Sequence, residues 1–268
     1  MQEYLIRTWH RPRPLPPGRW NSTQRWNDLL FAHWPVSAAA VQAFLPESLD
    51  VDVFQGSAWV GMVPFWLDRI KFRGMPALPG MRGIPDLNLR TYVRERDSGA
   101  QGVYCFSIDA SSLLAVAAAR TAFHLPYYWA EMHFEQRSER EFAFYSRRHL
   151  APRPVIFKVR YRGLGPTRRL AEIAPGTLEY FLTERYCLFT RNHVGLPVRA
   201  NIHPVPSPLE EAEAEIERND LAAATGIQLP PTPPVLHYSR RLAIYIWPAE
   251  LVRPALARRP VTVAVTPS

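Results

Sequence analysis

The sequence is poor in cysteine and has no long hydrophobic run. Its two cysteines, Cys105 and Cys187, lie in apolar segments and form no CxxC pair, so we expect buried thiols rather than a disulfide framework. No stretch of eighteen uncharged apolar residues occurs, and the first twenty residues lack the continuous apolar segment of a signal peptide. We therefore expect a cytoplasmic protein without membrane spans.

Several common catalytic motifs are also missing. The chain contains no GxSxG, HExxH or GxxxxGK[ST] sequence, which argues against the usual serine hydrolases, zinc proteases and P-loop proteins. Eight histidines are present, but none is paired at a spacing of three or four residues. A metal site would have to combine distant residues such as His33, His124, His133 and His203. We expect structural histidines there, and neither a metal nor a cofactor.

Lysine is almost absent from a strongly basic chain. Lys71 and Lys158 are the only lysines, although the formal net charge is +8 and the pI is about 9.8. The basic residues are therefore nearly all arginines, and they are scattered along the sequence rather than gathered into one run. This scattering argues against a nucleic-acid interface, which would need basic residues clustered on one surface. A high net positive charge alone affects solubility and association and does not indicate a binding site.

What the chain does contain is many prolines, roughly twice the usual share, and apolar residues in globular proportions. Hydrophobic residues make up 47%, charged residues 21%, and there are 27 prolines, so we expect one domain with a sizeable core and many rigid loops. We predict a proline-rich arm over residues 1–20, the domain over 21–252 and a tail over 253–268.

The hydrophobic patterns predict a mainly antiparallel α+β barrel or sandwich. Residues 87–95 alternate with period two, and residues 103–110 return as the partner strand of a hairpin. Counting similar segments gives about nine strands, mostly consecutive, with two to four helices. The helices are expected after Ser37 as a cap, after Ser111 or Ser112, from Pro175, and over the acidic stretch 207–226.

Arginine and tyrosine form the most informative polar set. Arg90 and Tyr92 are two residues apart in a predicted strand and therefore share one face. Arg120 lies in an alanine-rich helix, where a buried guanidinium needs an acid such as Asp109 or Glu184, or an anion in a cavity. The alternative is that Arg90 and Arg120 are salt bridges that only stabilise the fold.

Five blocks of the chain resemble a known family. They are "RWNDLLFAHWPV", "FLPESLDVDVFQGSAWVGMVPFWLDRI", "LNLRTYVR", "GVYCFSIDASSLLAVAAARTAFHLPYYWAEM" and "FLTERYCLF". In this order they resemble the YqjF-like family (DUF2071), which has no established activity and belongs to the acetoacetate decarboxylase-like superfamily. The resemblance covers most of residues 20–250. It implies a large antiparallel β-barrel or cone with outer helices and a central pocket.

The resemblance also implies that the superfamily's catalytic lysines are missing here. In the decarboxylases a helix runs into a Pro-Lys-Lys step, whose first lysine forms a Schiff base with the keto acid. The matching step in this chain is Pro126-Tyr127-Tyr128. Arg25 is the loosest match for the arginine that holds the substrate carboxylate, and the glutamates of that pocket have no counterpart around Trp59 to Gly61. Schiff-base decarboxylation is therefore disfavoured.

These observations favour a barrel that binds a small anionic or carbonyl-bearing molecule in a central pocket. The expected pocket residues are Tyr127, Tyr128, Arg90 and Arg120, with Asp109 and Glu184 as orienting partners and Arg25, Tyr92 and His33 as weaker candidates. A lysine-independent lyase, isomerase or hydrolase acting on a keto acid-like substrate is the enzymatic alternative. A basic nucleic-acid-associated protein is the more distant one, and the apolar strand surfaces allow a homo-oligomer.

Overall fold

The computed structural model describes residues 8, 10–76, 83–122, 125–167, 173–192, 194–205 and 208–252. The predicted tail over 253–268 and the first seven residues of the predicted arm lie outside these ranges. No helix in the described residues is long and apolar enough to cross a membrane.

Strands dominate the structure. They are β1 (Ser22–Val36), β2 (Leu49–Val51), β3 (Ala58–Phe72), β4 (Ile84–Glu95), β5 (Gln101–Ala110), β6 (Tyr127–Gln136), β7 (Glu141–Arg148), β8 (Ile156–Gly163), β9 (Cys187–Arg191), β10 (Pro197–Pro204), β11 (Glu210–Asn219), β12 (Val235–Ile246) and β13 (Glu250–Leu251). The helices are short: α1 (Ala38–Gln42), α2 (Leu113–Ala122), α3 (Leu178–Thr183) and α4 (Leu221–Ala224).

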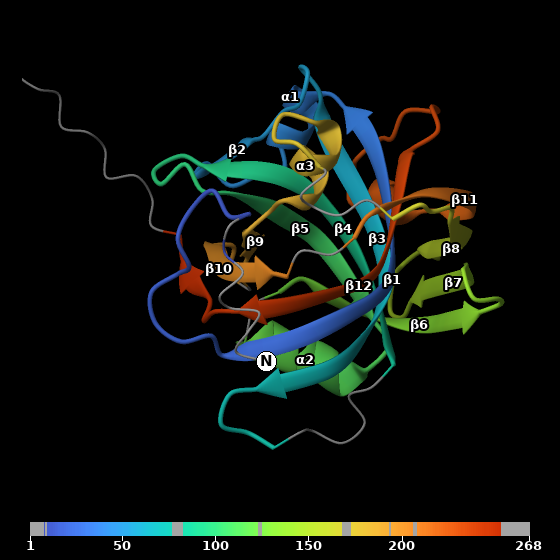
Figure 1. The fold of residues 1–268 in the computed structure, drawn as a ribbon, viewed down its shortest axis with the longest axis horizontal. Helices are drawn as coiled ribbons and strands as arrows, with labels where there is room; N and C mark the ends of the chain where they lie inside the picture. The colour runs from blue at the N-terminus through green and yellow to red at the C-terminus, as the bar shows by residue number, and fades with distance from the viewer. Residues whose placement is uncertain are drawn as a thin grey trace, which may run out of the picture.

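The strands close into two circuits that share a curved wall. The shared wall contains β12, β1, β3, β4 and β5 in this order. One circuit closes through β6, β7, β8 and β11, which makes a nine-stranded barrel, and the other closes through β9 and β10. β5 pairs in parallel with both β6 and β9, whereas the other pairs are antiparallel. The predicted mainly antiparallel barrel with outer helices is confirmed (Figure 1).

The two circuits have different interiors because strand residues alternate between the two faces of the shared wall. Leu87, Leu89 and Val93 of β4 belong to one large apolar core, together with Phe142, Phe144 and Phe157 of β7 and β8. The intervening β4 residues Asp86, Asn88, Arg90 and Tyr92 project to the opposite face. The nine-stranded circuit is therefore filled with hydrophobic side chains, whereas the smaller circuit receives the polar face of β4.

The helices lie outside the strands. Figure 1 shows α1 and α3 at one end of the molecule and α2 at the other. Thr177 caps α3, since its hydroxyl accepts a hydrogen bond from the Tyr180 amide at 3.3 Å. Ser37 precedes α1 as predicted but forms no side-chain cap hydrogen bond, and α1 ends at Gln42.

The acidic segment 207–226 is mostly a strand, so the predicted helix there is wrong. Its Glu-Ala alternation from Glu211 to Ala214 is also a period-two pattern, and the structure uses that period in β11. Pairing with β8 places the glutamates opposite basic residues: Arg162 Nε donates to Glu213 at 2.9 Å, and Arg160 Nη2 donates to Glu215 at 2.9 Å. Only the four residues of α4 remain helical. These cross-strand charge pairs explain why the strand is preferred.

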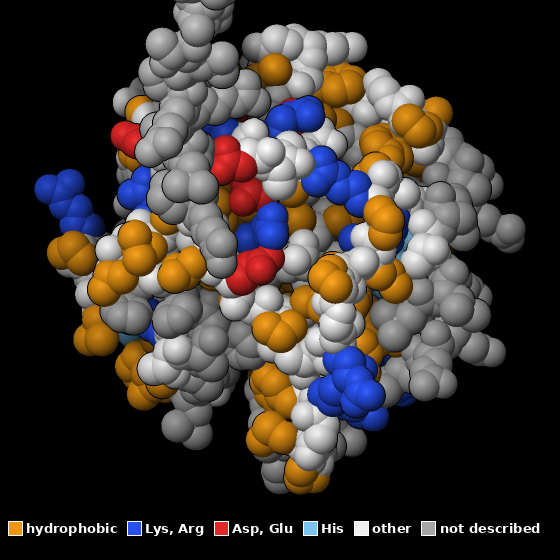
Figure 2. All heavy atoms as spheres, turned by 90° about the vertical axis from the view of Figure 1, so that its left-hand side faces the viewer, with side chains coloured by type: hydrophobic (Ala, Val, Ile, Leu, Met, Phe, Trp, Pro, Cys, Tyr) orange, Lys and Arg blue, Asp and Glu red, His pale blue; other side chains and the backbone are white. Residues whose placement is uncertain are grey.

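The described part of the N-terminal arm packs on the side where β9, β10 and β13 lie. Leu15 and Trp20 pack against Val205, Tyr245 and Trp247. Figure 2 views this side of the molecule and shows acidic and basic side chains gathered near its centre, with hydrophobic side chains around them. The arm is thus held by apolar contacts at the end of the smaller circuit.

Candidate functional site

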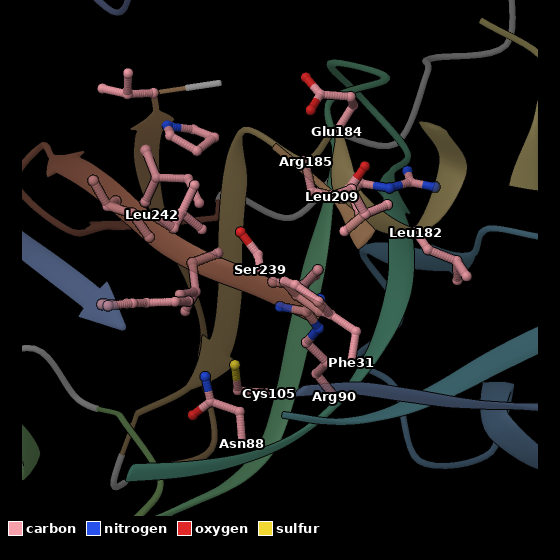
Figure 3. Close-up of a pocket in the computed structure, with 18 of the residues that line it drawn as sticks. Phe31, Asn88, Arg90, Cys105, Leu182, Glu184, Arg185, Leu209, Ser239 and Leu242 are labelled. Carbon is pink, nitrogen blue, oxygen red and sulfur yellow. The ribbon is translucent and has the colours of Figure 1, made fainter. Parts of the chain in front are cut away.

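A cavity of about 70 Å³ lies inside the smaller circuit. Its wall comes from the shared strands, from β9 and β10, and from the segment after α3. The lining residues are Trp26, Phe31, Asn88, Arg90, Val103, Cys105, Ile173, Leu182, Thr183, Glu184, Arg185, Leu188, Ile202, Pro204, Val205, Leu209, Ser239, Leu242 and Ile244. Figure 3 shows Asn88, Arg90 and Cys105 projecting from neighbouring strands, with Glu184 at the opposite end of the group.

Arg90 is the central charged group of this cavity. Its side chain is buried, with 7% exposure, and its guanidinium carbon lies 5.5 Å from the ring centre of Phe31 and 5.9 Å from that of Tyr92. The Nε atom is buried without a hydrogen-bond partner, and no carboxylate of the described ranges forms an ion pair with this guanidinium. A buried cation without a counter-charge is costly, so this arrangement suits an anionic ligand.

A β-bulge brings Cys105 next to Arg90. The pairing of β4 with β5 shifts between Leu89 and Arg90, so that Leu89 is opposite Ser107 but Arg90 is opposite Cys105. The extra residue reverses the side-chain alternation of β5 and turns Cys105 towards the cavity. Burial raises the pKa of the Cys105 thiol to about 12, despite the nearby Arg90. Cys105 is therefore a neutral thiol and not a thiolate nucleophile.

Two more polar residues of β4 carry buried atoms without partners. These atoms are Oδ1 of Asp86 and Oδ1 of Asn88. The Tyr127 hydroxyl donates to Oδ2 of Asp86 at 3.4 Å. Desolvation, followed by the charge of Asp109, raises the pKa of Asp86 well above its usual value, and desolvation also raises the pKa of Tyr127. Both groups are therefore biased towards their protonated forms. Neither lines the cavity, so Tyr127, a predicted pocket residue, is a partner of Asp86 next to the cavity wall.

Glu184 lines the other end of the cavity. Its carboxylate accepts a hydrogen bond from the Tyr186 hydroxyl, and burial raises its pKa to about 7, although Tyr186 and Arg11 act in the opposite direction. Arg11, from the N-terminal arm, lies over the Tyr186 ring at 4.4 Å and donates to the Ile202 carbonyl oxygen at 2.9 Å. The carboxyl of Glu184 can thus exchange a proton near neutral pH.

The neighbouring Arg185 is already paired. Its Nη1 donates to Oδ2 of Asp52 at 2.7 Å, and its Nε donates to the Phe181 carbonyl oxygen at 2.8 Å. Its guanidinium also lies 5.0 Å from the ring centre of Tyr92. Arg185 therefore fixes the segment after α3 to the barrel, which leaves Arg90 as the arginine available to a ligand.

Tyr92 and His33 support this site without lining the cavity. The Tyr92 hydroxyl bonds to Nε2 of His33 at 2.7 Å and donates to the Leu182 carbonyl oxygen at 2.9 Å. The ring of His33 fits closely against Gly61, because a Cβ atom at Gly61 would lie 2.7 Å from Nε2. The two weaker candidates from the sequence thus attach α3 to the barrel wall beside Arg90.

Asp109 on β5 and Tyr128 on the neighbouring β6 both contact Arg148 on the side of the nine-stranded circuit, contrary to prediction. Asp109 accepts from Nε of Arg148 at 2.7 Å and from the Ser146 hydroxyl at 3.0 Å. Tyr128 is 38% exposed and packs under the Arg148 guanidinium at 4.1 Å. The β5 bulge is the reason, since it places Asp109 on the opposite face from Cys105 despite their even spacing. Asp109 is thus a partner of Arg148 and not of Arg120.

Arg120 and Arg25 are also outside the cavity. Arg120 is exposed on α2, where its Nε donates to the Tyr127 carbonyl oxygen at 2.7 Å. An exposed guanidinium needs no buried acid, which removes the reason for predicting a pocket role. Arg25 forms a two-pronged ion pair with Asp68 across β1 and β3, with Nε to Oδ1 at 2.6 Å. Neither arginine can therefore hold a ligand in this cavity.

The lysines and histidines that the structure describes do not line the cavity. Lys71 is exposed and Lys158 pairs with Glu217, so neither lines the cavity. Within the part of the chain that the structure describes, no group of three or more His, Cys, Asp or Glu side chains is arranged to hold a metal ion. His124 lies outside the described residues.

Sequence reasoning missed Asp86, Asn88, Cys105 and Arg11. Asn88 already lies in the alternating stretch 87–95 on the face of Arg90 and Tyr92, and extending that pattern by one residue towards the N-terminus would have added Asp86. Cys105 depends on the bulge, and Arg11 depends on the path of the arm, which have no signal in the sequence.

Comparison with known proteins agrees with this architecture. The model of the DUF2071 family, described as an uncharacterized conserved protein, matches residues 23–243. The uncharacterized protein YqjF of Bacillus subtilis is 41% identical over 234 residues, which cover 87% of this chain and 93% of that protein.

Solved structures show the same fold at low identity. Acetoacetate decarboxylase from Legionella pneumophila is 13% identical with a TM-score of 0.58, covering 92% of this chain and 93% of its own. The enduracididine biosynthesis enzyme MppR complexed with pyruvate is 12% identical with a TM-score of 0.57, covering 90% of this chain and 93% of its own. The fold is thus acetoacetate decarboxylase-like, and the chain belongs to the DUF2071 family.

Proposed function

We propose that this protein binds a small carboxylate in the cavity of the smaller circuit, with Arg90 as the counter-charge. The observation that carries the proposal is the buried Arg90 guanidinium, whose Nε has no partner and which has no ion pair among the described residues. Burial without a counter-charge destabilises a protein, and a bound carboxylate would supply both the charge and hydrogen-bond acceptors. The similar fold of the MppR complex with pyruvate supports a small carboxylate as the class of ligand.

Titration of the purified protein with acetate, butanoate and pyruvate tests this proposal. Calorimetry should show binding of at least one of them, and native mass spectrometry of the protein as purified should show any ligand retained from the cell. Arg90→Met should weaken that binding by roughly 10- to 100-fold, as expected for loss of hydrogen bonds to a charged group. Arg120→Met is the matched control, because it removes an exposed arginine outside the cavity, and it should change the affinity less than twofold.

Stability measurements on the same variants separate a ligand site from a structural arginine. Arg90→Met should leave the free protein equally stable or more stable, because it removes a buried charge that lacks a partner. If Arg90→Met lowers the free energy of unfolding by several kcal/mol and the wild-type protein binds none of the carboxylates, Arg90 is a structural residue and the proposal is wrong.

A second candidate function is a lysine-independent enzyme acting on a keto acid-like substrate. The observation that favours it is the carboxyl of Glu184, which lines the cavity with a pKa of about 7 and can donate or accept a proton near neutral pH. Proton NMR of pyruvate in D₂O tests it directly, since an enzyme of this kind would exchange the methyl protons for deuterium. Glu184→Gln should then abolish the exchange, and no exchange by the wild-type protein would exclude this reaction with pyruvate.

A further inference from the structure

We infer that the preferred ligand is an amphipathic monocarboxylate with a short apolar tail of about three carbons, and not a compact polar acid. This inference rests on the proposed function, because it assumes that Arg90 binds the carboxylate. It adds the identity of the remaining part of the molecule, which follows from the chemistry of the rest of the cavity wall.

The polar groups available to a ligand lie at one end of the cavity. Arg90 and Asn88 are neighbours on one face of β4. The unpartnered buried Nε of Arg90 can donate to a carboxylate, whereas the unpartnered Oδ1 of Asn88 can only accept a hydrogen bond. Cys105 lies opposite Arg90 across the strand pair and supplies only a neutral thiol. In Figure 3 these three side chains group together. The carboxylate would therefore sit at this end.

The other polar side chains of the wall already have hydrogen-bond partners. Thr183 donates to the Glu179 carbonyl oxygen at 2.7 Å, and Ser239 donates to the Pro208 carbonyl oxygen at 3.1 Å. Arg185 is bonded to Asp52, and the Glu184 carboxylate is bonded to the Tyr186 hydroxyl. Away from Glu184, a polar group on the tail of a ligand would thus lose water to a mainly apolar wall, which is unfavourable.

The remaining wall is apolar and comes from several strands. It includes Phe31 on β1, Leu188 on β9, Ile202 on β10, and Leu242 and Ile244 on β12. Each methylene group that such a wall removes from water contributes about 0.8 kcal/mol, which corresponds to about a fourfold gain in affinity. This wall therefore favours binding of an aliphatic tail.

The cavity volume limits the length of that tail. A buried water needs roughly 10–15 Å³ of cavity volume, so about 70 Å³ holds about five to seven water-sized groups. Butanoate and 3-methylbutanoate, with six and seven non-hydrogen atoms, match this range. Octanoate, with ten non-hydrogen atoms, exceeds this range.

The decisive comparison is butanoate against 3-hydroxypropanoate, measured by calorimetry on the full-length wild-type protein. The two acids have the same number of non-hydrogen atoms and differ only in a terminal methyl or hydroxyl group. Butanoate should bind at least tenfold more tightly. Affinity should also rise about fourfold for each carbon from acetate to butanoate and fall again at octanoate.

A wall variant locates the tail. Leu242→Asn should weaken butanoate binding about tenfold and leave 3-hydroxypropanoate binding within twofold. Leu150→Asn, at a leucine that is 95% exposed, is the control and should affect neither acid. If Leu242→Asn does not fold, the comparison of the two acids on the wild-type protein still tests whether the cavity prefers an apolar tail.

The outcomes distinguish this inference from the proposed function. Equal, Arg90-dependent binding of butanoate and 3-hydroxypropanoate overturns the apolar tail and leaves the carboxylate site intact. Tighter binding of 3-hydroxypropanoate overturns it in the same way. If no carboxylate binds at tens of millimolar, both the proposed carboxylate site and the inferred apolar tail are wrong.

Discussion

The hydroxyl of Tyr92 lies 2.7 Å from Nε2 of His33 and donates to the Leu182 carbonyl oxygen at 2.9 Å. A carbonyl oxygen can only accept, so the single hydroxyl proton of Tyr92 is committed to Leu182. Nε2 of His33 must then be the donor to the hydroxyl oxygen, which fixes the imidazole as the Nε2-protonated tautomer. This contact fixes α3, and with it one end of the cavity, to the wall that carries Arg90.

Tyr92→Phe should lower the free energy of unfolding by about 1–3 kcal/mol, because it leaves a buried donor on His33 and a buried carbonyl without their partner. Urea denaturation measures this change. Tyr128→Phe is the control: its ring is 38% exposed and should tolerate the loss of the hydroxyl within about 0.5 kcal/mol. An equal effect of the two substitutions would contradict the role given to Tyr92.

His33 should remain neutral at mildly acidic pH. Desolvation, and then the charges of Arg90 and His237, lower its pKa well below the usual 6.5. Between that lowered pKa and 6.5 the unfolded chain binds the proton that the folded chain does not, so the contribution of His33 to stability decreases as pH falls below 6.5. Nitrogen-15 NMR should show the neutral Nε2-protonated ring from pH 8 to pH 5. A titration near pH 6.5 would contradict this prediction.

Breaking the buried pair between Arg148 and Asp109 should be costly. Arg148→Met leaves Asp109, which is fully buried, without its cation and should lower the free energy of unfolding by about 3–5 kcal/mol. The double variant Arg148→Met with Asp109→Asn should lose less than the sum of the single changes. Arg162→Met is the control, since both partners of its ion pair are 58% exposed, and it should change stability by less than about 1 kcal/mol.

The affinity for a carboxylate should increase as pH falls through 7. The Glu184 carboxylate lines the same cavity, and an ionised group there opposes a bound anion; with a pKa of about 7 it loses this charge at lower pH. Calorimetric titrations with butanoate from pH 8 to pH 5.5 should show this dependence, and Glu184→Gln should remove it. Glu135→Gln, on exposed β6, should leave the dependence unchanged.

The pH dependence of stability should also report Glu184. Its pKa is higher in the folded chain than the usual 4.5, so the folded chain binds more protons than the unfolded chain between pH 4.5 and 7. The contribution is therefore fully present below pH 4.5 and is lost as pH rises through 7. Glu184→Gln should make urea-unfolding free energies rise more steeply with pH across this range, and an unchanged slope would contradict the raised pKa.

Both thiols should be unreactive in the folded protein. Burial raises the pKa of Cys105 to about 12 and that of Cys187 to about 11. Iodoacetamide at pH 8 should therefore label neither residue in the native protein and both in urea, as measured by mass spectrometry. Rapid native labelling of Cys105 would show that the cavity wall opens.

The sequence predicted the features that depend on local periodicity. The alternation of β4 identified both the strand and the shared face of Arg90 and Tyr92, because period two in a strand is a property of consecutive residues. The central hairpin and the mainly antiparallel barrel followed from similar signals, whereas the resemblance to a known family came from five blocks of sequence. The choice between helix and strand was wrong for β11. Its glutamates suggested a helix, but they pair with residues of β8 across the sheet.

The site predictions that were wrong concern residues whose positions depend on one bulge and on long-range packing. The bulge opposite Arg90 changes which face of β5 each later residue occupies, and it moved Asp109 and Tyr128 away from the cavity. Whether Arg120 is buried depends on which side of α2 meets the barrel, which an alanine-rich helix does not indicate. Register irregularities of this kind carry no composition or spacing signal.

The pairing of β1 with β12 gives the cavity an unusual relation to the synthesis of the chain. Trp26 is opposite Leu242 in that pair, and both residues line the cavity. β1 can therefore pair with β12 only after nearly the whole polypeptide has been synthesised. Bringing two strands together over so long a separation has a high entropic cost, so this pairing forms slowly. Incomplete chains released before β12 would lack the part of the cavity wall that Leu242 and Ile244 provide, so the cavity forms only in finished molecules.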